Sequence, residues 1–190
     1  MHSGQFTALL DANVLYPFFI RDLLLSLAEE YLYRPKWSDD IEKEWTRNLM
    51  GNRPDIKPEL ILHTVTEMNR SFKDAKVIGY EELVRSLSLP DPDDRHVLAA
   101  AIVSRSDVIV TFNLKDFDRK ELSKYNIEAV HPDDFTVNIL DLDDEKAKSA
   151  LEKMVRRRKN PPVALIDLIN RAGKSSLPKS EIRLRMLFNL

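Results

Sequence analysis

The chain has 190 residues, of which 43% are hydrophobic, and a formal net charge of −2. A chain of this length can bury a core as one domain, or as one domain with an extension. It has no cysteine, which excludes a disulfide framework and any thiolate metal site and favours a reducing compartment. It has no run of about 18 apolar residues and no charged segment at its start, so we expect a cytoplasmic protein without a membrane span or signal peptide.

Charge is distributed unevenly along the chain. Residues 141–190 contain 12 Lys and Arg against 7 Asp and Glu, whereas residues 1–140 contain 17 against 24. An acidic body with a basic tail favours a cation site in the body and a polyanion contact in the tail. An ordinary solvated surface explains the same distribution about as well.

Short apolar strands alternate with helical patterns over the first 135 residues. This alternation predicts an α/β fold whose parallel sheet is covered by helices on both faces. We expect strands at 6–10, 33–37, 75–78, 107–112 and 127–130, and helices at 17–32, from 38 or 39 onward, and at 58–72, 80–87, 92–104 and 119–125.

Only helical patterns follow residue 137, near 143–158, 161–172 and 178–188. Proline and glycine separate these segments and mark the ends of the helices. We therefore predict a first domain over residues 1–136 and a basic helical C-terminal extension over residues 137–190.

Acidic residues gather where the predicted strands end. Asp11 directly follows the first strand, and Asp116 follows the strand of "DVIVTF". Asp94 lies in the first turn of the helix before that strand, and Glu44 flanks the apolar stripe of another helix. Ligands bind at the carboxyl ends of the strands in such sheets, so we expect these four acids to meet at one edge.

Each acid also has an ordinary structural explanation. Asp11 and Asp116 fit turns, and Glu44 fits a solvated helix face. In "LPDPDDRHVLAAAI", Asp91 fits a helix N-cap, and the helix dipole favours Asp93 and Asp94 behind it. Taken singly, each structural reading is about as good as the functional one, but four acids from distant segments favour a common site.

Converging carboxylates repel one another, and a cation relieves that repulsion. An all-oxygen ligand set without cysteine favours a hard ion, Mg²⁺ or Mn²⁺. Such an ion can activate a bound water and stabilise charge on a phosphodiester. The acids therefore predict metal-dependent phosphoester hydrolysis, in which no protein nucleophile is needed.

Four stretches in order resemble the PIN-domain family of metal-dependent ribonucleases, whose bacterial members include VapC-like toxins. They are "LLDANVLYP", a Glu on a following helix, "DPDDRHVLAAAI" and "VTFNLKDF". The resemblance covers about residues 1–135. It implies a three-layer α/β/α sandwich with a central parallel sheet, an acidic Mg²⁺ or Mn²⁺ centre and cleavage of single-stranded RNA. It further implies a cognate antitoxin of a type II toxin–antitoxin pair, with a homodimer also possible.

The resemblance also assigns roles to individual residues. It gives the catalytic and metal-binding roles to four acids, with Asp118 as a close competitor for the last, and supporting roles to nearby polar side chains. From their own positions, Asp91 is expected to assist and several basic residues to contact phosphate. The catalytic set is Asp11, Glu44, Asp94 and Asp116, the supporting set is Asn13, Asp91 and Asn113, and the phosphate-contacting set is Arg95, Lys115, Arg156, Arg157 and Arg158.

Other functions fit the sequence less well. No glycine-rich phosphate loop or serine-hydrolase elbow is present. His96 and His131 lack a second histidine at ligand spacing, and we interpret both as structural or surface residues. A DNA flap nuclease, a phosphatase, and a non-catalytic RNA-binding PIN-like module remain alternatives to the ribonuclease.

Overall fold

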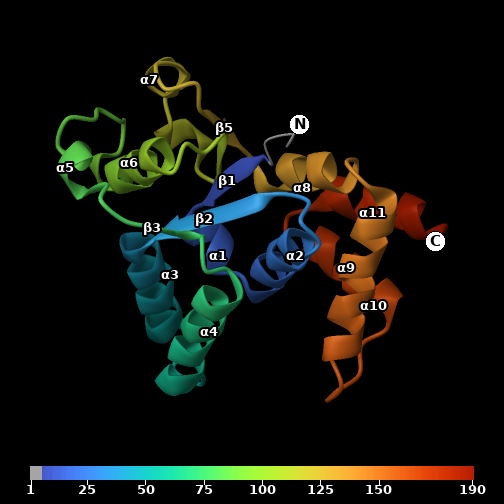
Figure 1. Cartoon of the computed structure of the whole chain (residues 1–190). Helices are drawn as coiled ribbons and strands as arrows, with labels where there is room; N and C mark the ends of the chain where they lie inside the picture. The colour runs from blue at the N-terminus through green and yellow to red at the C-terminus, as the bar shows by residue number, and fades with distance from the viewer. Residues whose placement is uncertain (1–5) are drawn as a thin grey trace. The chain divides into compact units, whose positions relative to one another are not determined.

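The computed structural model describes residues 6–190 (Figure 1). The chain forms two compact units. The first, which we call the sheet unit, contains residues 6–16 and 35–130. The second, the helical unit, contains residues 17–34 and 131–190. Each unit is described by itself below.

A five-stranded parallel sheet forms the centre of the sheet unit, with strand order β3-β2-β1-β4-β5. The apolar first strand is fully buried, as expected for a central parallel strand. This architecture confirms the predicted α/β class and the parallel sheet. The strands are β1 (Thr7–Leu10), β2 (Arg34–Ser38), β3 (Lys76–Val77), β4 (Val108–Val110) and β5 (Glu128–Val130).

The helices of the sheet unit fall between these strands. Helix α6 packs against β1 and β4, the two central strands, through its run of buried apolar residues. The short α1 was not predicted, since four residues are too few to show helical periodicity. The helices are α1 (Ala12–Leu15), α3 (Asp39–Asn52), α4 (Pro58–Ser71), α5 (Glu81–Val84), α6 (Arg95–Val103) and α7 (Arg119–Ser123).

The start of α6 differs from the sequence expectation of a helix beginning at Pro92. Residues Pro92–Asp94 form a 3₁₀ turn, and the α-helix begins only at Arg95. A 3₁₀ turn is a common start of an α-helix. Asp91 caps this turn as predicted, because its Oδ1 accepts the backbone N–H of Asp93 at 2.9 Å.

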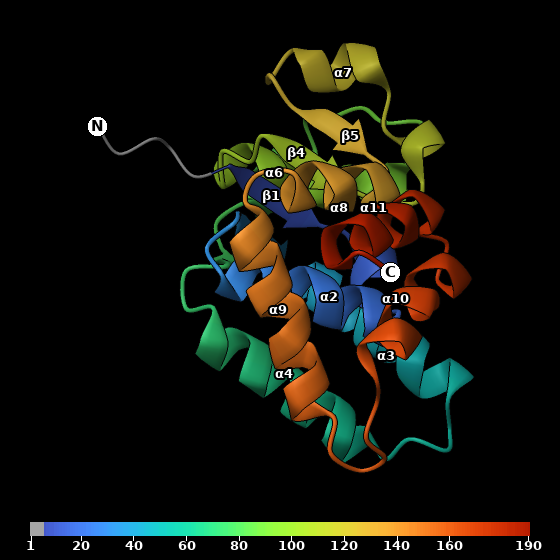
Figure 2. The same ribbon diagram turned by 90° about the vertical axis from the view of Figure 1, so that its right-hand side faces the viewer.

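The helical unit contains α2 from the N-terminal half of the chain and the four C-terminal helices (Figure 2). The sequence-based boundary between residues 136 and 137 falls inside α8, and α2 groups with the C-terminal helices because it packs against α9. No helix in residues 6–190 is long and apolar enough to cross a membrane. The helices are α2 (Phe18–Glu29), α8 (Pro132–Leu140), α9 (Asp144–Arg157), α10 (Leu165–Lys174) and α11 (Pro178–Phe188).

A buried carboxylate ties α8 to α11 within the helical unit. Asp133, which is only 3% exposed, accepts the backbone N–H groups of Lys179 and Ser180 at 2.9 and 2.8 Å. It also accepts the hydroxyl of Ser180 at 2.6 Å. These N–H groups belong to the first turn of α11, so Asp133 caps that helix from a distant part of the chain.

Candidate metal centre

The candidate site lies where the two central strands end. Strands β1 and β4 pair in parallel with Leu10 opposite Val110, so the residues that follow them are neighbours. Asp11 follows β1, and its backbone N–H donates to the carbonyl of Val110 at 3.1 Å. Thr111 follows β4 and is fully buried. The sheet register therefore places a carboxylate and a hydroxyl side by side at its carboxyl edge.

Asp11 is held by hydrogen bonds to both of its carboxylate oxygens. Its Oδ1 accepts the backbone N–H of Ala12 at 2.6 Å. Its Oδ2 accepts the amide of Asn13 at 2.6 Å and the hydroxyl of Thr111 at 2.7 Å. Asp11 is only 3% exposed, and this burial raises its pKa despite the hydrogen bonds, which act to lower it. A buried carboxylate of this kind is stabilised by a positive charge.

A small polar network fixes the residues around Asp11. The amide of Asn13 also donates to the hydroxyl of Thr111 at 3.0 Å, and the oxygen of Asn13 accepts the backbone N–H of Phe112 at 3.1 Å. The backbone N–H of Asn113 donates to the hydroxyl of Thr111 at 3.0 Å. Sequence reasoning missed Thr111, because the predicted strand at 107–112 contained it, whereas β4 ends at Val110. The side chain of Asn113 is exposed and makes no hydrogen bond that caps the following turn.

Asp94 is a half-buried carboxylate with a strongly raised pKa. Its half-burial and four nearby carboxylates raise its pKa to about 7. Among those carboxylates, Asp11 has the largest effect. Burial is the largest cause of this shift, and the like charges add to it, so they lie close enough to repel one another. The carboxylates that act on it are Asp11, Asp91, Asp116 and Glu44.

Glu44 reaches the site from α3 and meets His96 of α6. The Nε2 of His96 lies 3.6 Å from Oε2 of Glu44. Burial lowers the pKa of His96, but the hydrogen bond and charge of Glu44, with smaller effects of Asp40 and Asp11, raise it overall. The Nδ1 of His96 is buried without a hydrogen-bond partner. His96 therefore contributes to the charge balance of the site beyond the structural or surface role expected for it.

The structure distinguishes Asp116 from Asp118, which the sequence left as alternative residues for the acidic site. Asp116 lies in the 3₁₀ turn Leu114–Asp116, is partly buried and raises the pKa of Asp94. Asp118 instead caps α7, because its Oδ1 accepts the backbone N–H of Lys120 at 3.0 Å. Asp116 is thus the better candidate for the acidic site.

A hard divalent cation fits the chemistry of this donor set. The candidate donors are carboxylate and amide oxygens, and the mutual repulsion at Asp94 is what a bound cation would relieve. Within residues 6–190, however, no three His, Asp or Glu side chains are arranged to bind one ion as they stand. The fit therefore rests on donor chemistry and charge, and the side chains must shift to complete a coordination shell.

The predicted phosphate-contacting residues divide between the two units. In the sheet unit, Lys115 is exposed beside Asp116, and the Nε of Arg95 donates to the carbonyl of Pro92 at 3.0 Å. The three arginines at the end of α9 belong to the helical unit, and each lies within ion-pair distance of an acid of that unit. These pairs are Arg156 with Glu152, Arg157 with Glu29, and Arg158 with Asp22.

The PIN-domain family model matches residues 7–115, more than half of the chain. The chain belongs to the PIN-domain family. A second model, the VapC50 C-terminal domain, matches residues 132–185, which lie in the helical unit of this PIN-domain protein. Both matches confirm the resemblance that the sequence motifs indicated.

One relative of this PIN-domain protein is a Mycobacterium tuberculosis protein named "Putative ribonuclease VapC50". It is 40% identical over 114 residues, which cover 60% of this chain. The match spans 66% of the relative, just under two thirds of its length. No solved structure matches the chain significantly.

Proposed function

We propose that this PIN-domain protein is a divalent-metal-dependent endoribonuclease that hydrolyses single-stranded RNA. The observation that carries the proposal is the convergence of carboxylates on the half-buried Asp94, whose pKa is raised to about 7 by burial first and by these like charges second. A group of like charges at the carboxyl edge of a parallel sheet is expected where a cation and a phosphate bind. The relative named as a ribonuclease supports RNA as the substrate.

Four acids would hold the metal in this proposal. Asp11 is the central ligand, since hydrogen bonds to both its oxygens fix its carboxylate at the strand end. Asp94, Glu44 and Asp116 complete the shell directly or through water. A bound Mg²⁺ or Mn²⁺ would lower the pKa of a water and neutralise charge on the phosphodiester.

The polar neighbours orient these ligands. Asn13 and Thr111 fix the carboxylate of Asp11, and such outer hydrogen bonds set ligand orientation. In this proposal a substrate phosphate or a metal-bound water would meet Asn113, Asp91, Arg95 and Lys115, of which Arg95 is partly exposed and the other three are exposed. Positioning of this kind contributes to catalysis by fixing the reacting groups before the reaction.

We further propose that the protein is the toxin of a type II toxin–antitoxin pair and acts in the cytoplasm. The name of the relative and the match to the VapC50 C-terminal domain support this role. A cognate antitoxin would then be its protein partner, and a homodimer is also proposed. A small neighbouring reading frame that encodes a DNA-binding protein would support the pairing.

The central test is metal-dependent cleavage. The purified chain should cleave single-stranded RNA with Mg²⁺ or Mn²⁺, and EDTA should abolish cleavage. Asp11→Asn and Asp116→Asn should lose activity, whereas Asp118→Asn, whose carboxylate caps α7, should keep it. Full activity after exhaustive chelation would overturn the mechanism.

Competition separates this proposal from its alternatives. RNA should be cleaved in preference to DNA flaps and small phosphoesters in a mixture of the three. Preferential cleavage of DNA would identify a flap nuclease. Binding of RNA with no cleavage under any metal would identify a non-catalytic module.

A further inference from the structure

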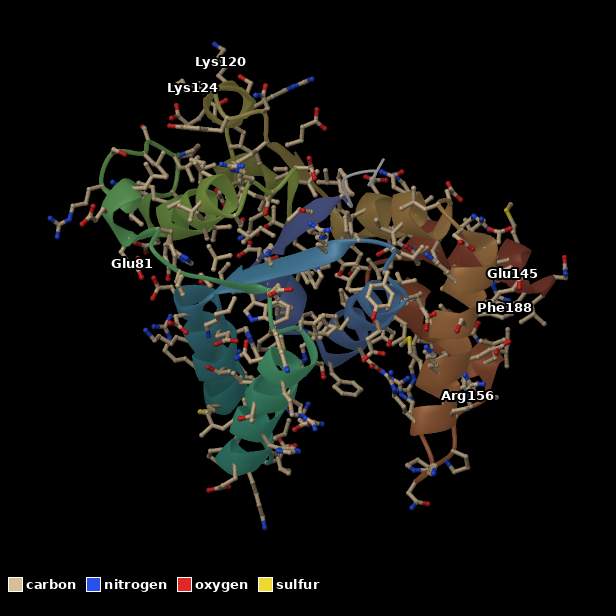
Figure 3. The ribbon with its side chains drawn as sticks, viewed as in Figure 1. Glu81, Lys120, Lys124, Glu145, Arg156 and Phe188 are labelled. Atoms are coloured by element: carbon tan, nitrogen blue, oxygen red, sulfur yellow. The ribbon has the colours of Figure 1, made fainter. Side chains whose placement is uncertain are left out.

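A basic cavity of about 500 Å³ lies in the helical unit, where α9 ends and the chain turns toward α10. Four cationic side chains and one amide line it: Arg157, Arg158, Lys159, Arg171 and Asn160. No acidic residue lines this cavity. Its volume lies in the range of about 300–1,000 Å³ that small-ligand sites occupy. Arg156, which sits at the same end of α9 in Figure 3, does not line it.

Two of the four cationic side chains form ion pairs with acidic residues of α2. Arg157 pairs with Glu29, and Arg158 pairs with Asp22 at 2.5 Å, both on α2. The guanidinium of Arg158 also lies 5.6 Å from the ring centroid of Phe18. These contacts fix the two guanidinium groups before any ligand binds, which lowers the conformational entropy lost on binding.

The other two cations have no acidic partner. Lys159 and Arg171 are exposed, and neither forms an ion pair with the acids among residues 6–190. With two cations paired and two unpaired, the cavity keeps an excess of positive charge. It is therefore built to receive an anion.

We propose that this cavity anchors the phosphodiester backbone of the RNA substrate. Guanidinium groups bind phosphate oxygens with two parallel hydrogen bonds, and an ammonium adds a point charge. The amide of Asn160 can donate a further hydrogen bond to a phosphate oxygen. This inference rests on the proposed function for the nature of the substrate, and it adds a second binding site in the helical unit.

The lining favours a nucleic acid over an acidic protein partner. Protein interfaces gain most of their affinity from buried aromatic and apolar anchors, and this cavity offers only Pro161 and Val163. Phosphate contacts need charge and hydrogen-bond donors, which make up most of the lining. Such contacts carry no sequence information, so the cavity should anchor RNAs of any sequence.

The test measures binding of a labelled single-stranded RNA to the full chain in EDTA, where metal-dependent cleavage cannot occur. The double variant Lys159→Ala/Arg171→Ala should weaken binding equally for two RNAs of different sequence. Loss of two phosphate contacts should reduce the slope of log affinity against log salt by about 1.4. Unchanged affinity and slope would overturn the proposal.

The matched control removes two lysines from the other end of α9. Lys146→Ala/Lys148→Ala makes the same charge change near Glu145, which marks that end in Figure 3, about 15 Å away along the helix. This control should bind RNA like the wild type. An equal loss in both variants would show a general charge effect and would overturn the cavity as the site.

A second arm replaces RNA with poly-glutamate of similar charge. If the cavity variant loses poly-glutamate binding but keeps RNA binding, the cavity serves an acidic protein and the proposal is wrong. Because no cleavage is measured, this inference and the proposed function fail separately. A chain that binds RNA through the cavity but never cleaves it would refute only the proposed function.

Discussion

The hydroxyl of Thr111 donates a hydrogen bond to Oδ2 of Asp11 at 2.7 Å, across the two central strands. The two residues are 100 positions apart in sequence and become neighbours only because β1 and β4 pair in register. Thr111 also accepts hydrogen bonds from Asn13 and from the backbone of Asn113. One buried hydroxyl thus connects the candidate central ligand to both strand ends.

Removal of this hydroxyl should weaken metal binding without removing a ligand. Thr111→Val keeps the shape of the side chain and loses the hydrogen bond to Asp11. Loss of such an orienting partner lowers metal affinity or activity by about 10–100-fold. Mn²⁺ titration and the cleavage rate measure the effect, and Thr111→Ser, which keeps the hydroxyl, should stay near the wild type. Equal losses in both variants would point to packing rather than to the hydrogen bond.

The metal-free protein should become less stable as the pH rises from about 4 to about 7. Burial and neighbouring carboxylates raise the pKa of Asp94 from 3.8 to about 7 in the folded chain. Between these values the folded state binds a proton that the unfolded state has lost, so the free energy of unfolding falls with pH. Thermal melting in EDTA across this range measures the effect, and the raised pKa of Asp11 acts in the same direction.

Asp94→Asn distinguishes the effect of this carboxylate on stability from the effects of other titrating groups. The variant should lose cleavage, yet melt at or above the wild-type temperature at pH 8 in EDTA, because it relieves carboxylate repulsion. At pH 5 the two proteins should melt at similar temperatures. Mn²⁺ should stabilise the wild type more than the variant. A variant that is less stable than the wild type at pH 8 would contradict the proposed repulsion.

The sequence located candidate site residues where they lie next to a strand or helix with a clear hydrophobic pattern. Asp11, Asp94 and Asp116 stand at predicted strand ends or helix starts, and Asp11 and Asp116 both raise the pKa of Asp94. Thr111 was not found, because it fell inside the predicted strand at 107–112 and a threonine there has no charge to single it out. Glu42 lies in the first turn of α3, and its contacts could not be read from the sequence either. It is buried, accepts the amide of Asn69 at 2.7 Å and pairs with Lys76.

The remaining differences between the sequence-based predictions and the structure arise from packing between segments that are distant in sequence. The apolar stripe of α2 predicts a helix correctly, but a stripe does not reveal which partner covers it. Here α2 packs against α9 and carries Asp22 and Glu29, which pair with the arginines of the tail. The basic run at the end of α9 therefore could not be divided into paired and unpaired cations from the sequence.

The buried cap of α11 should be important for the stability of the helical unit. Asp133→Ala leaves the buried N–H of Ser180 and the part-buried N–H of Lys179 without this acceptor. A buried donor that loses its partner costs about 1–3 kcal/mol, so the free energy of unfolding should fall by on the order of 3 kcal/mol. The control is Asp134→Ala, which removes an exposed pair with Lys179 worth about 0–1 kcal/mol. Chemical denaturation of both variants measures the difference, and similar losses would contradict a special role of the buried carboxylate.

The three acids before α6 should respond differently to substitution. Asp91 caps the turn through the N–H of Asp93, Asp93 itself is exposed, and Asp94 is partly buried among the other carboxylates. Asp91→Ala should therefore reduce stability by about 0.5–2 kcal/mol as a lost cap. Asp93→Asn removes only a favourable charge at a helix start and should reduce stability by about 0.3–1 kcal/mol.

Cleavage assays on the same variants complete this test. Asp93→Asn should keep activity because its carboxylate is exposed and is not one of the proposed metal ligands. Asp91 is among the carboxylates that raise the pKa of Asp94, so Asp91→Ala should reduce activity in part through the site as well as through the lost cap. Asp94→Asn should abolish cleavage. If Asp93→Asn were inactive while Asp94→Asn still cleaved RNA, the turn would present the wrong carboxylate to the metal, and the assignment of the site would have to be reversed.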